Sequence, residues 1–203
     1  MGNIITENVS VEELLNNDES IEKNNKQLEY LDYIKEHVLN VQKAFYLHFL
    51  PLLESDHISE KISDETFKDA IKNASTLVIE HDASKYGDEE FDGYREKYYP
   101  TAREKSDPEF EEKAKERSEI AWIHHYSNNP HHPMYWVNKE TNEPIDMELS
   151  YIIEMICDWE AMSMKYRSDT QEWYKNKAEK EKRAMTNWTK DMVEEILFNV
   201  IYH

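Results

Sequence analysis

The residues best suited to do chemistry in this chain are a histidine followed directly by an aspartate, His81-Asp82, in the stretch HDASKYGDEEF. An imidazole and a carboxylate are both ligands that divalent transition metals accept. The apolar run TLVIE (residues 76–80) precedes the pair and places it at the end of a buried helix. Gly87 is predicted to close this helix in the left-handed conformation. A metal site is therefore the first hypothesis, and its weight depends on ligands elsewhere in the chain.

Histidines are concentrated in a second stretch, HHYSNNPHHPMYW, where four of the nine in the chain fall within nine residues. They form two pairs, His124/His125 and His131/His132. The Asn-Asn-Pro turn between the pairs folds the chain back, so at least one histidine of each pair is predicted to face one cleft. Within the pairs, His124 and His132 are favoured. A histidine run on the surface is the alternative, but the tryptophans and tyrosines on both sides favour a buried wall.

Isolated residues complete the candidate site. His37 lies on the flank of an apolar helical face, where a histidine at the edge of the core is the alternative to a ligand. Glu154 and Asp158 stand four residues apart and share one face of a helix; a buried carboxylate must be paired, bind a metal or be protonated. Lys85, one helical turn after the His-Asp pair, could meet a phosphate as a point charge. Asp88 and Glu154 are the candidates for a carboxylate that activates water.

The elements that must position these residues are helices. Apolar residues recur at three- and four-residue steps from Leu28 to Phe45, and the stretch from Leu149 to Tyr166, which includes Cys157, is apolar almost all round and reads as a central helix. Only three glycines occur, which disfavours sheet hairpins. The predicted fold is all-α: a polar N-terminal arm (residues 1–27) and one helical domain (28–203) of five to seven helices. Helices are expected near residues 28–50, 67–80, 108–123 (which carries Ile120, Ala121, Trp122 and Ile123 into the core) and 149–166, with two more within 169–202.

Composition restricts the partners. The formal charge of −19 disfavours broad contact with a nucleic-acid backbone, which requires Lys and Arg to release counterions. The single cysteine rules out an internal disulfide and is typical of a reducing compartment. No apolar stretch reaches membrane-spanning length. We therefore expect a cytoplasmic protein with no membrane partner; the sequence leaves a homodimer open.

The order His37, His81-Asp82, Asp158 resembles the signature of the HD-domain superfamily of metal-dependent phosphohydrolases, over roughly Leu28 to Tyr166. The motif HDAS is similar to that of the bacterial 5′-deoxynucleotidase branch, and the additional histidines are similar to those of two-metal members. The fuller pattern (HDxSKYG, AWxHH, NPHHPxYW, EMICDWxAM) also resembles a family of bacterial and phage proteins, which supplies no activity.

The resemblance implies an HD-like helical bundle that holds one or two divalent ions (Mn, Fe, Co or Zn) and hydrolyses a nucleotide or another small phosphorylated metabolite. One position departs from the nucleotidase branch, because Lys85 stands where that branch has a glutamate. The carboxylate that activates water would then be Asp88 or Glu154. Two alternatives remain: an HD-fold di-iron oxygenase, and a non-catalytic acidic protein that mimics nucleic acid or inhibits a host protein.

Overall fold

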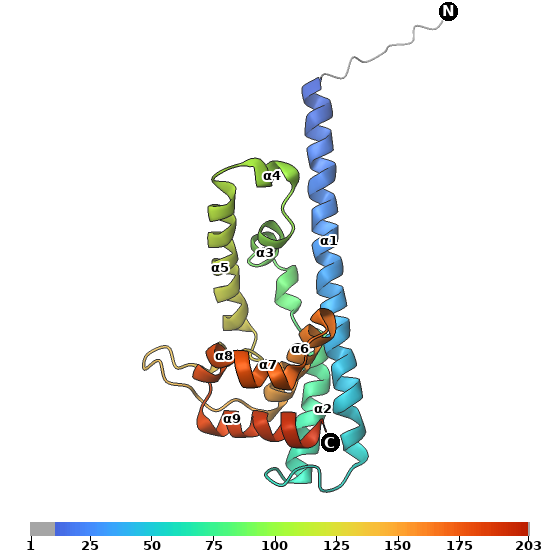
Figure 1. Cartoon of the computed structure of the whole chain (residues 1–203), viewed down its shortest axis with the longest axis vertical. Helices are drawn as coiled ribbons and strands as arrows, with labels where there is room; N and C mark the ends of the chain where they lie inside the picture. Colours follow the sequence, from blue (N-terminus) through green and yellow to red (C-terminus); the bar gives the residue numbers. More distant parts are fainter. Residues whose placement is uncertain (1–10, 203) are drawn as a thin grey trace, which may run out of the picture.

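The computed structural model describes residues 11–202, with side chains from residue 18 onward. These residues form helices and no β-strand, so the predicted all-α class is confirmed (Figure 1). The predicted number of helices was too low, because short turns divide each of the regions 91–128 and 170–200 into several helices. The spacing of apolar residues does not reveal these turns. The α-helices of the described residues are α1 (Val11–His48), α2 (Asp64–Glu80), α3 (Phe91–Tyr98), α4 (Ala102–Ser106), α5 (Phe110–Asn128), α6 (Leu149–Tyr166), α7 (Thr170–Lys177), α8 (Glu179–Arg183) and α9 (Asn187–Glu194).

Shorter helical turns connect these helices. They are the 3₁₀ segments η1 (Leu50–Glu54), η2 (Ala83–Tyr86) and η3 (Pro133–Trp136), and the π-helical turn η4 (Glu195–Val200). None of the helices within residues 11–202 combines the length and the apolar character that crossing a membrane would require.

Helix α1 is 38 residues long and runs along nearly the whole length of the molecule (Figure 1). Residues 11–27, which were assigned to a separate polar arm, continue this helix because no proline or glycine interrupts it. Glu19 pairs with Arg103, and Glu22 accepts a hydrogen bond from the backbone of Ala102, so this part of α1 contacts α4. The rest of the predicted arm, residues 1–10, lies outside the described residues.

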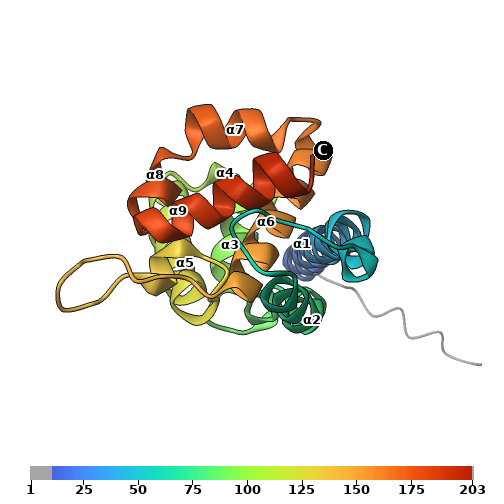
Figure 2. The same ribbon diagram turned by 90° about the horizontal axis from the view of Figure 1, so that it is seen from below.

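Helix α6 is the central helix, with the bounds predicted from its apolar sequence. It packs against both α1 and α2, which run side by side, and α9 crosses below it (Figure 2). Ile152, Ile153, Ile156 and Cys157 of α6 are fully buried in the main core, so the assignment of Cys157 to the core is confirmed. A packed centre of three helices therefore carries His37 on α1, the His-Asp pair at the end of α2, and Asp158 on α6.

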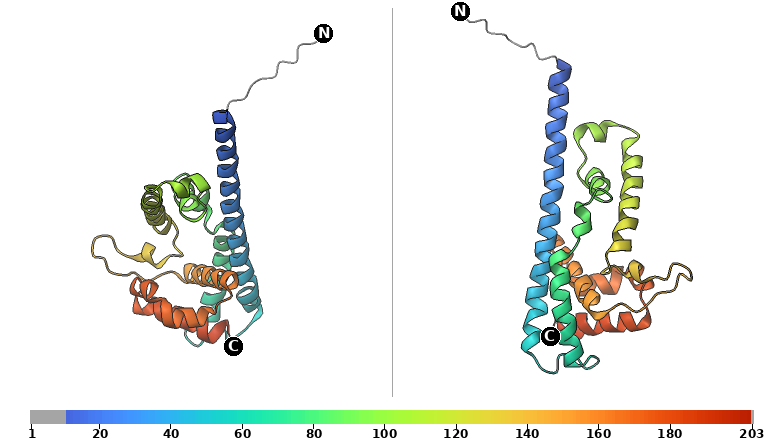
Figure 3. Two further views of the ribbon diagram at one scale, coloured as in Figure 1. Left: turned by 45° about the horizontal axis from the view of Figure 1, so that its top comes forward. Right: turned by 180° about the vertical axis from the view of Figure 1, so that it is seen from behind.

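Helices α3 and α5 pack together beside α1 (Figure 3). A second, smaller cluster of buried residues joins this pair to α1. Its centre is Tyr30, Ile34, Tyr94 and Ala121. Helix α5 contributes the small residue Ala121 to this cluster. Ile120 and Ile123 of the same helix were predicted to be in the core, but they are 62% and 54% exposed.

The close approach of α3 to α5 explains the narrow apolar face of α5. A Cβ atom at Gly93 of α3 would lie 2.8 Å from the carbonyl oxygen of Arg117 and 3.0 Å from the Cβ of Ala121. Glycine is therefore required at this position by the packing of two helices, and the bulky residues of α5 are displaced toward solvent.

The end of α2 presents the His-Asp pair. Ser63 caps the start of the helix by accepting a hydrogen bond from the backbone of Thr66. At the other end, Asp82 adopts a left-handed conformation (φ 59°, ψ 19°), whereas Gly87 does not (φ −82°). The predicted role of Gly87 was therefore wrong. The left-handed conformation costs a non-glycine residue about 1–2 kcal/mol, least for Asn and Asp, and strain of this kind is concentrated at functional sites.

Candidate metal centre

A first group of ligand atoms meets where α1, the end of α2 and α6 converge. His37 Nε2 lies 3.3 Å from His81 Nε2, 3.4 Å from Asp82 Oδ2 and 3.1 Å from Asp158 Oδ1. His81 Nε2 lies 3.6 Å from Asp82 Oδ2 and 3.9 Å from Asp158 Oδ1. Ligands at about 2.1 Å from a tetrahedral ion are separated from one another by about 3.4 Å. The separations observed here, 3.1–3.9 Å, bracket this value, so these side chains are close enough together to surround one ion.

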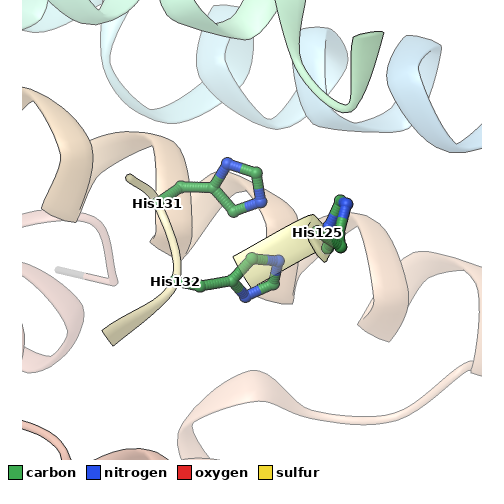
Figure 4. A group of neighbouring side chains, drawn as sticks. All are labelled: His125, His131 and His132. Atoms are coloured by element: carbon green, nitrogen blue, oxygen red, sulfur yellow. The ribbon is translucent and has the colours of Figure 1, made fainter. Parts of the chain in front are cut away.

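A second group lies on the other side of Asp82. His125 Nε2 is 3.2 Å and His131 Nε2 is 3.7 Å from Asp82 Oδ1. Each of His125, His131 and His132 offers a ring nitrogen within 4.8 Å of those of the other two. Figure 4 shows these three rings facing one another, His125 from the last turn of α5 and the other two from the loop that follows. Asp82 thus turns one carboxylate oxygen toward each group.

The second group contains buried polar atoms that have no hydrogen-bond partner in the part of the chain that the structure describes. They are Asp82 Oδ1, His131 Nε2 and His132 Nε2. A buried polar atom without a partner costs about 1–3 kcal/mol, and three in one place are unusual for a native structure. A cation bound between them would satisfy all three, so the side chains present fit a metal ion.

The ionisation states of two histidines in the second group suit metal binding. Burial lowers the pKa of His131, and so does the charge of the neighbouring His81. Burial and the neighbouring His131 and His125 hold the pKa of His132 well below its ordinary value. Both rings are therefore neutral at neutral pH, and a neutral imidazole nitrogen is the form that binds a metal. For the third, His125, burial would lower the pKa, but hydrogen bonds to Asp82 and Glu90 outweigh it and raise the pKa.

The first group is rich in negative charge. Burial would raise the pKa of Asp82, but the charges of His81 and Lys85 outweigh it and hold this pKa well below its ordinary value. Burial would lower the pKa of His37, but hydrogen bonds to Asp158 and Asp82 raise it to about 9. With no metal bound, His37 therefore carries a proton between two carboxylates, and a metal ion would replace that proton.

Two buried glutamates hold the far sides of the histidine rings. Glu154 Oε1 accepts hydrogen bonds from His81 Nδ1 at 2.8 Å and from His131 Nδ1 at 3.1 Å. Glu90 accepts from His124 Nδ1 and His125 Nδ1, both at 2.8 Å. Carboxylates that accept from the second ring nitrogen fix which nitrogen of a histidine is free to bind a metal.

His81, His131 and Glu154 also lie close enough together to hold an ion of their own. The separations of 2.8 and 3.1 Å are ordinary hydrogen-bond lengths, and the Nε2 atoms of both rings already face Asp82. We therefore interpret Glu154 as a hydrogen-bond acceptor. Glu90 was missed by sequence analysis, since within the acidic run DEE nothing distinguishes the one carboxylate that is buried.

The structure separates the remaining predicted site residues. The structure corrects the prediction that favoured His124 as a ligand, because His124 belongs to neither group. Its side chain is 36% exposed, and its Nδ1 is hydrogen-bonded to Glu90. The helical geometry of α5 explains this difference. The side chains of adjacent residues on a helix point in different directions, and of the two only His125 points inward. Asp88 is exposed and does not line the cavity described below. Lys85 Nζ lies 2.5 Å from Asp82 Oδ2.

A cavity of about 500 Å³ opens beside the two groups. Its floor includes Asp82, His125, His132 and Asp158 from the ligand groups. Two lysines, Lys85 and Lys165, also line it, in spite of the acidic composition of the chain. The remaining wall is mainly aromatic and consists of Tyr30, Tyr33, Tyr94, Tyr98, Tyr99, Trp122, Met162 and Tyr166.

Fold and site together define an all-α protein with two groups of metal-ligand type that share one aspartate. The chain belongs to DUF5662, a family of unknown function, whose model matches residues 26–201. No curated protein and no solved structure matches the chain.

Proposed function

We propose that this protein is an HD-like, two-metal phosphohydrolase that acts on a nucleotide or another small phosphorylated metabolite. The observation that carries the proposal is the position of Asp82, whose two oxygens face two separate ligand groups at the floor of a cavity. The order of His37, His81-Asp82 and Asp158 along the chain, which resembles the HD signature, supports it further.

One ion would be held by His37, His81, Asp82 and Asp158, and the other by Asp82, His125, His131 and His132. Such ions lower the pKa of bound water and neutralise charge on a phosphoryl oxygen. The side chains of the protein would carry out the remaining steps of the reaction. Asp88 and Glu154 are poorly placed to activate water directly, because Asp88 is exposed and Glu154 is occupied by two histidines.

The two lysines would bind and orient the phosphate. Asp82 holds the ammonium group of Lys85 beside the ligand groups, and the charge of Asp82 raises the pKa of Lys85 against the effect of burial. Lys165 extends over the ring of Tyr33, with its Nζ 4.4 Å from the ring centre. Both cations therefore face a cavity that would otherwise repel an anion.

The aromatic wall would bind the rest of the substrate. Stacking of a nucleobase on an aromatic side chain contributes about 1–3 kcal/mol, and the cavity volume is within the usual range for small-molecule sites. Burial raises the pKa of Tyr33 to about 12 and that of Tyr30 further. Both hydroxyls stay protonated, and the buried hydroxyl of Tyr30 has no hydrogen-bond partner among the described residues, so it can donate a hydrogen bond to a ligand.

The test combines metal analysis with a substrate screen. Protein purified without a His-tag column should contain up to two ions per chain by elemental analysis. With Mn, Co, Fe or Mg, it should hydrolyse at least one compound of the screen: nucleoside monophosphates and sugar phosphates, followed by phosphate release, or cyclic dinucleotides, followed by formation of the linear dinucleotide. Asp82→Ala should abolish turnover, whereas Lys85→Ala should chiefly raise KM if the lysine binds ground state and transition state alike.

Two outcomes would favour other functions. The second group is rich in nitrogen ligands, which also suit iron, so oxygen uptake by the iron-loaded protein without phosphate release would favour an oxygenase. Protein that binds no metal and hydrolyses nothing would favour the non-catalytic, acidic interaction protein.

A further inference from the structure

We infer that Glu154 positions one histidine of each metal group at the same time, so that a single carboxylate sets the affinity of both ions. The inference rests on the metal centre proposed above and assigns to Glu154 a positioning role in place of a catalytic one.

The geometry of Glu154 is unusual in that one oxygen serves both groups. Its Oε1 accepts from His81 Nδ1, whose Nε2 faces His37 and Asp82 in the first group. The same Oε1 accepts from His131 Nδ1, whose Nε2 faces Asp82 Oδ1 in the second group. The ring centres of His81 and His131 are 4.3 Å apart, which is how both can reach one oxygen.

The hydrogen bonds determine the tautomer of each ring. A neutral imidazole that donates from Nδ1 leaves the lone pair of Nε2 free for a metal. Glu154 is 4% exposed, so no bulk solvent competes for either donor. Losing the carboxylate would release both rings from this tautomer and this orientation, and would leave two buried N–H groups without an acceptor.

Glu90 provides a matched comparison within the same chain. It is also fully buried and also accepts from two histidines, but only His125 among them belongs to a metal group. Loss of Glu90 should therefore weaken one ion, whereas loss of Glu154 should weaken both. Glu160, a buried glutamate of α6 that is bonded to Tyr202 and lies outside the centre, controls for the general effect of removing a buried carboxylate.

The experiment measures metal binding directly. Wild type, Glu154→Ala, Glu154→Gln, Glu90→Ala and Glu160→Ala are titrated with Co²⁺ and Zn²⁺ by calorimetry and, for Co²⁺, by visible absorption, with the data fitted to two sites. Changes in such outer carboxylates cost about 10–100-fold in metal affinity. We expect that loss for both ions in Glu154→Ala, for one ion in Glu90→Ala, and for neither in Glu160→Ala. Glu154→Gln, which keeps an acceptor oxygen, should fall between wild type and Glu154→Ala.

A second measurement does not depend on the variants being folded. Nitrogen-15 spectra of the wild-type protein with Zn²⁺ should show His81 and His131 protonated on Nδ1. Wild type that binds two ions while Glu154→Ala, still folded by circular dichroism, keeps one affinity unchanged would overturn the inference. So would an Nε2–H tautomer for either histidine. Wild type that binds no ion would instead overturn the proposed function on which the inference rests.

Discussion

The ion pair between Lys85 and Asp82 gives the sharpest test of how charge is balanced at the centre. The two groups are 2.5 Å apart, and the Asp82 side chain is 1% exposed. Lys85→Met keeps most of the aliphatic stem and removes the charge. We expect the substitution to destabilise the metal-free protein strongly and the metal-loaded protein only slightly.

The size of the expected loss of stability follows from the burial of the Lys85–Asp82 ion pair. Removing one partner of a buried ion pair costs about 3–5 kcal/mol. His37 and His125 also face Asp82, at 3.4 and 3.2 Å, and compensate part of its charge. We therefore expect a loss of about 2–3 kcal/mol without metal, which corresponds to a decrease in Tm of roughly 5–10 °C for a chain of this size. With ions held by the two ligand groups, their charge would replace that of Lys85 beside Asp82, and the loss should be below about 1 kcal/mol.

Differential scanning calorimetry with chelator and with saturating Zn²⁺ measures both values. Lys165→Met is the matched control, because Lys165 also lines the cavity but pairs, at 2.8 Å, with Glu36 on the surface. An exposed pair of this kind contributes at most about 1 kcal/mol. An equal loss of Tm with and without metal in Lys85→Met would refute the idea that metal ions and Lys85 balance the same carboxylate.

Other substitutions test the ligand assignment, the helix packing and the partly buried ion pair of Arg95 and Glu104. His125→Ala should lower the metal content by about one ion per chain, whereas His124→Ala should leave it unchanged; elemental analysis of the two would expose a wrong assignment. Gly93→Ala should lower the free energy of unfolding by about 1–3 kcal/mol through overpacking, and an unchanged urea midpoint would count against the close approach of α3 and α5. Burial would raise the pKa of Glu104, but its hydrogen bond from Arg95 outweighs this and lowers the pKa below 4.5. The stability this adds is present above pH 4.5 and lost as pH falls through the lowered pKa, so Glu104→Gln should unfold with a shallower acid dependence than wild type.

Apolar spacing predicted the helices that carry the site, because α2, α6 and the part of α1 from Tyr30 onward each bury one face in the core, and burial imposes the 3.6-residue period. It failed for α5, whose buried residues are Ala114, Ala121 and His125, and which packs closely against Gly93 of α3. Ile120 and Ile123 gave a misleading signal there. It also missed that residues 11–27 continue α1, since a polar helix on the surface leaves no apolar pattern.

Histidine density predicted which part of the chain approaches the His-Asp pair, but it did not predict which ring of the pair His124/His125 turns inward. That choice depends on the rotation of α5, which Gly93 and the packing against α3 determine. Asp82 shows the same limit. Its adjacency to His81 is visible in the sequence, whereas its left-handed backbone, which aims one oxygen at each ligand group, is a product of the fold.

The aromatic wall of the cavity also takes part in the packing of the helices. Tyr30 and Tyr94 belong to the cluster that joins α1 to α3 and α5, and they also line the cavity beside Asp82. Residues that join α1 to the α3–α5 pair are therefore also residues that would contact a substrate. Tyr30→Phe separates the two roles, because it keeps the packing and removes only the unpartnered hydroxyl. We expect unchanged or slightly higher stability together with weaker binding of a ligand that accepts this hydrogen bond. A variant that is less stable by more than about 1 kcal/mol would show instead that the hydroxyl serves the fold.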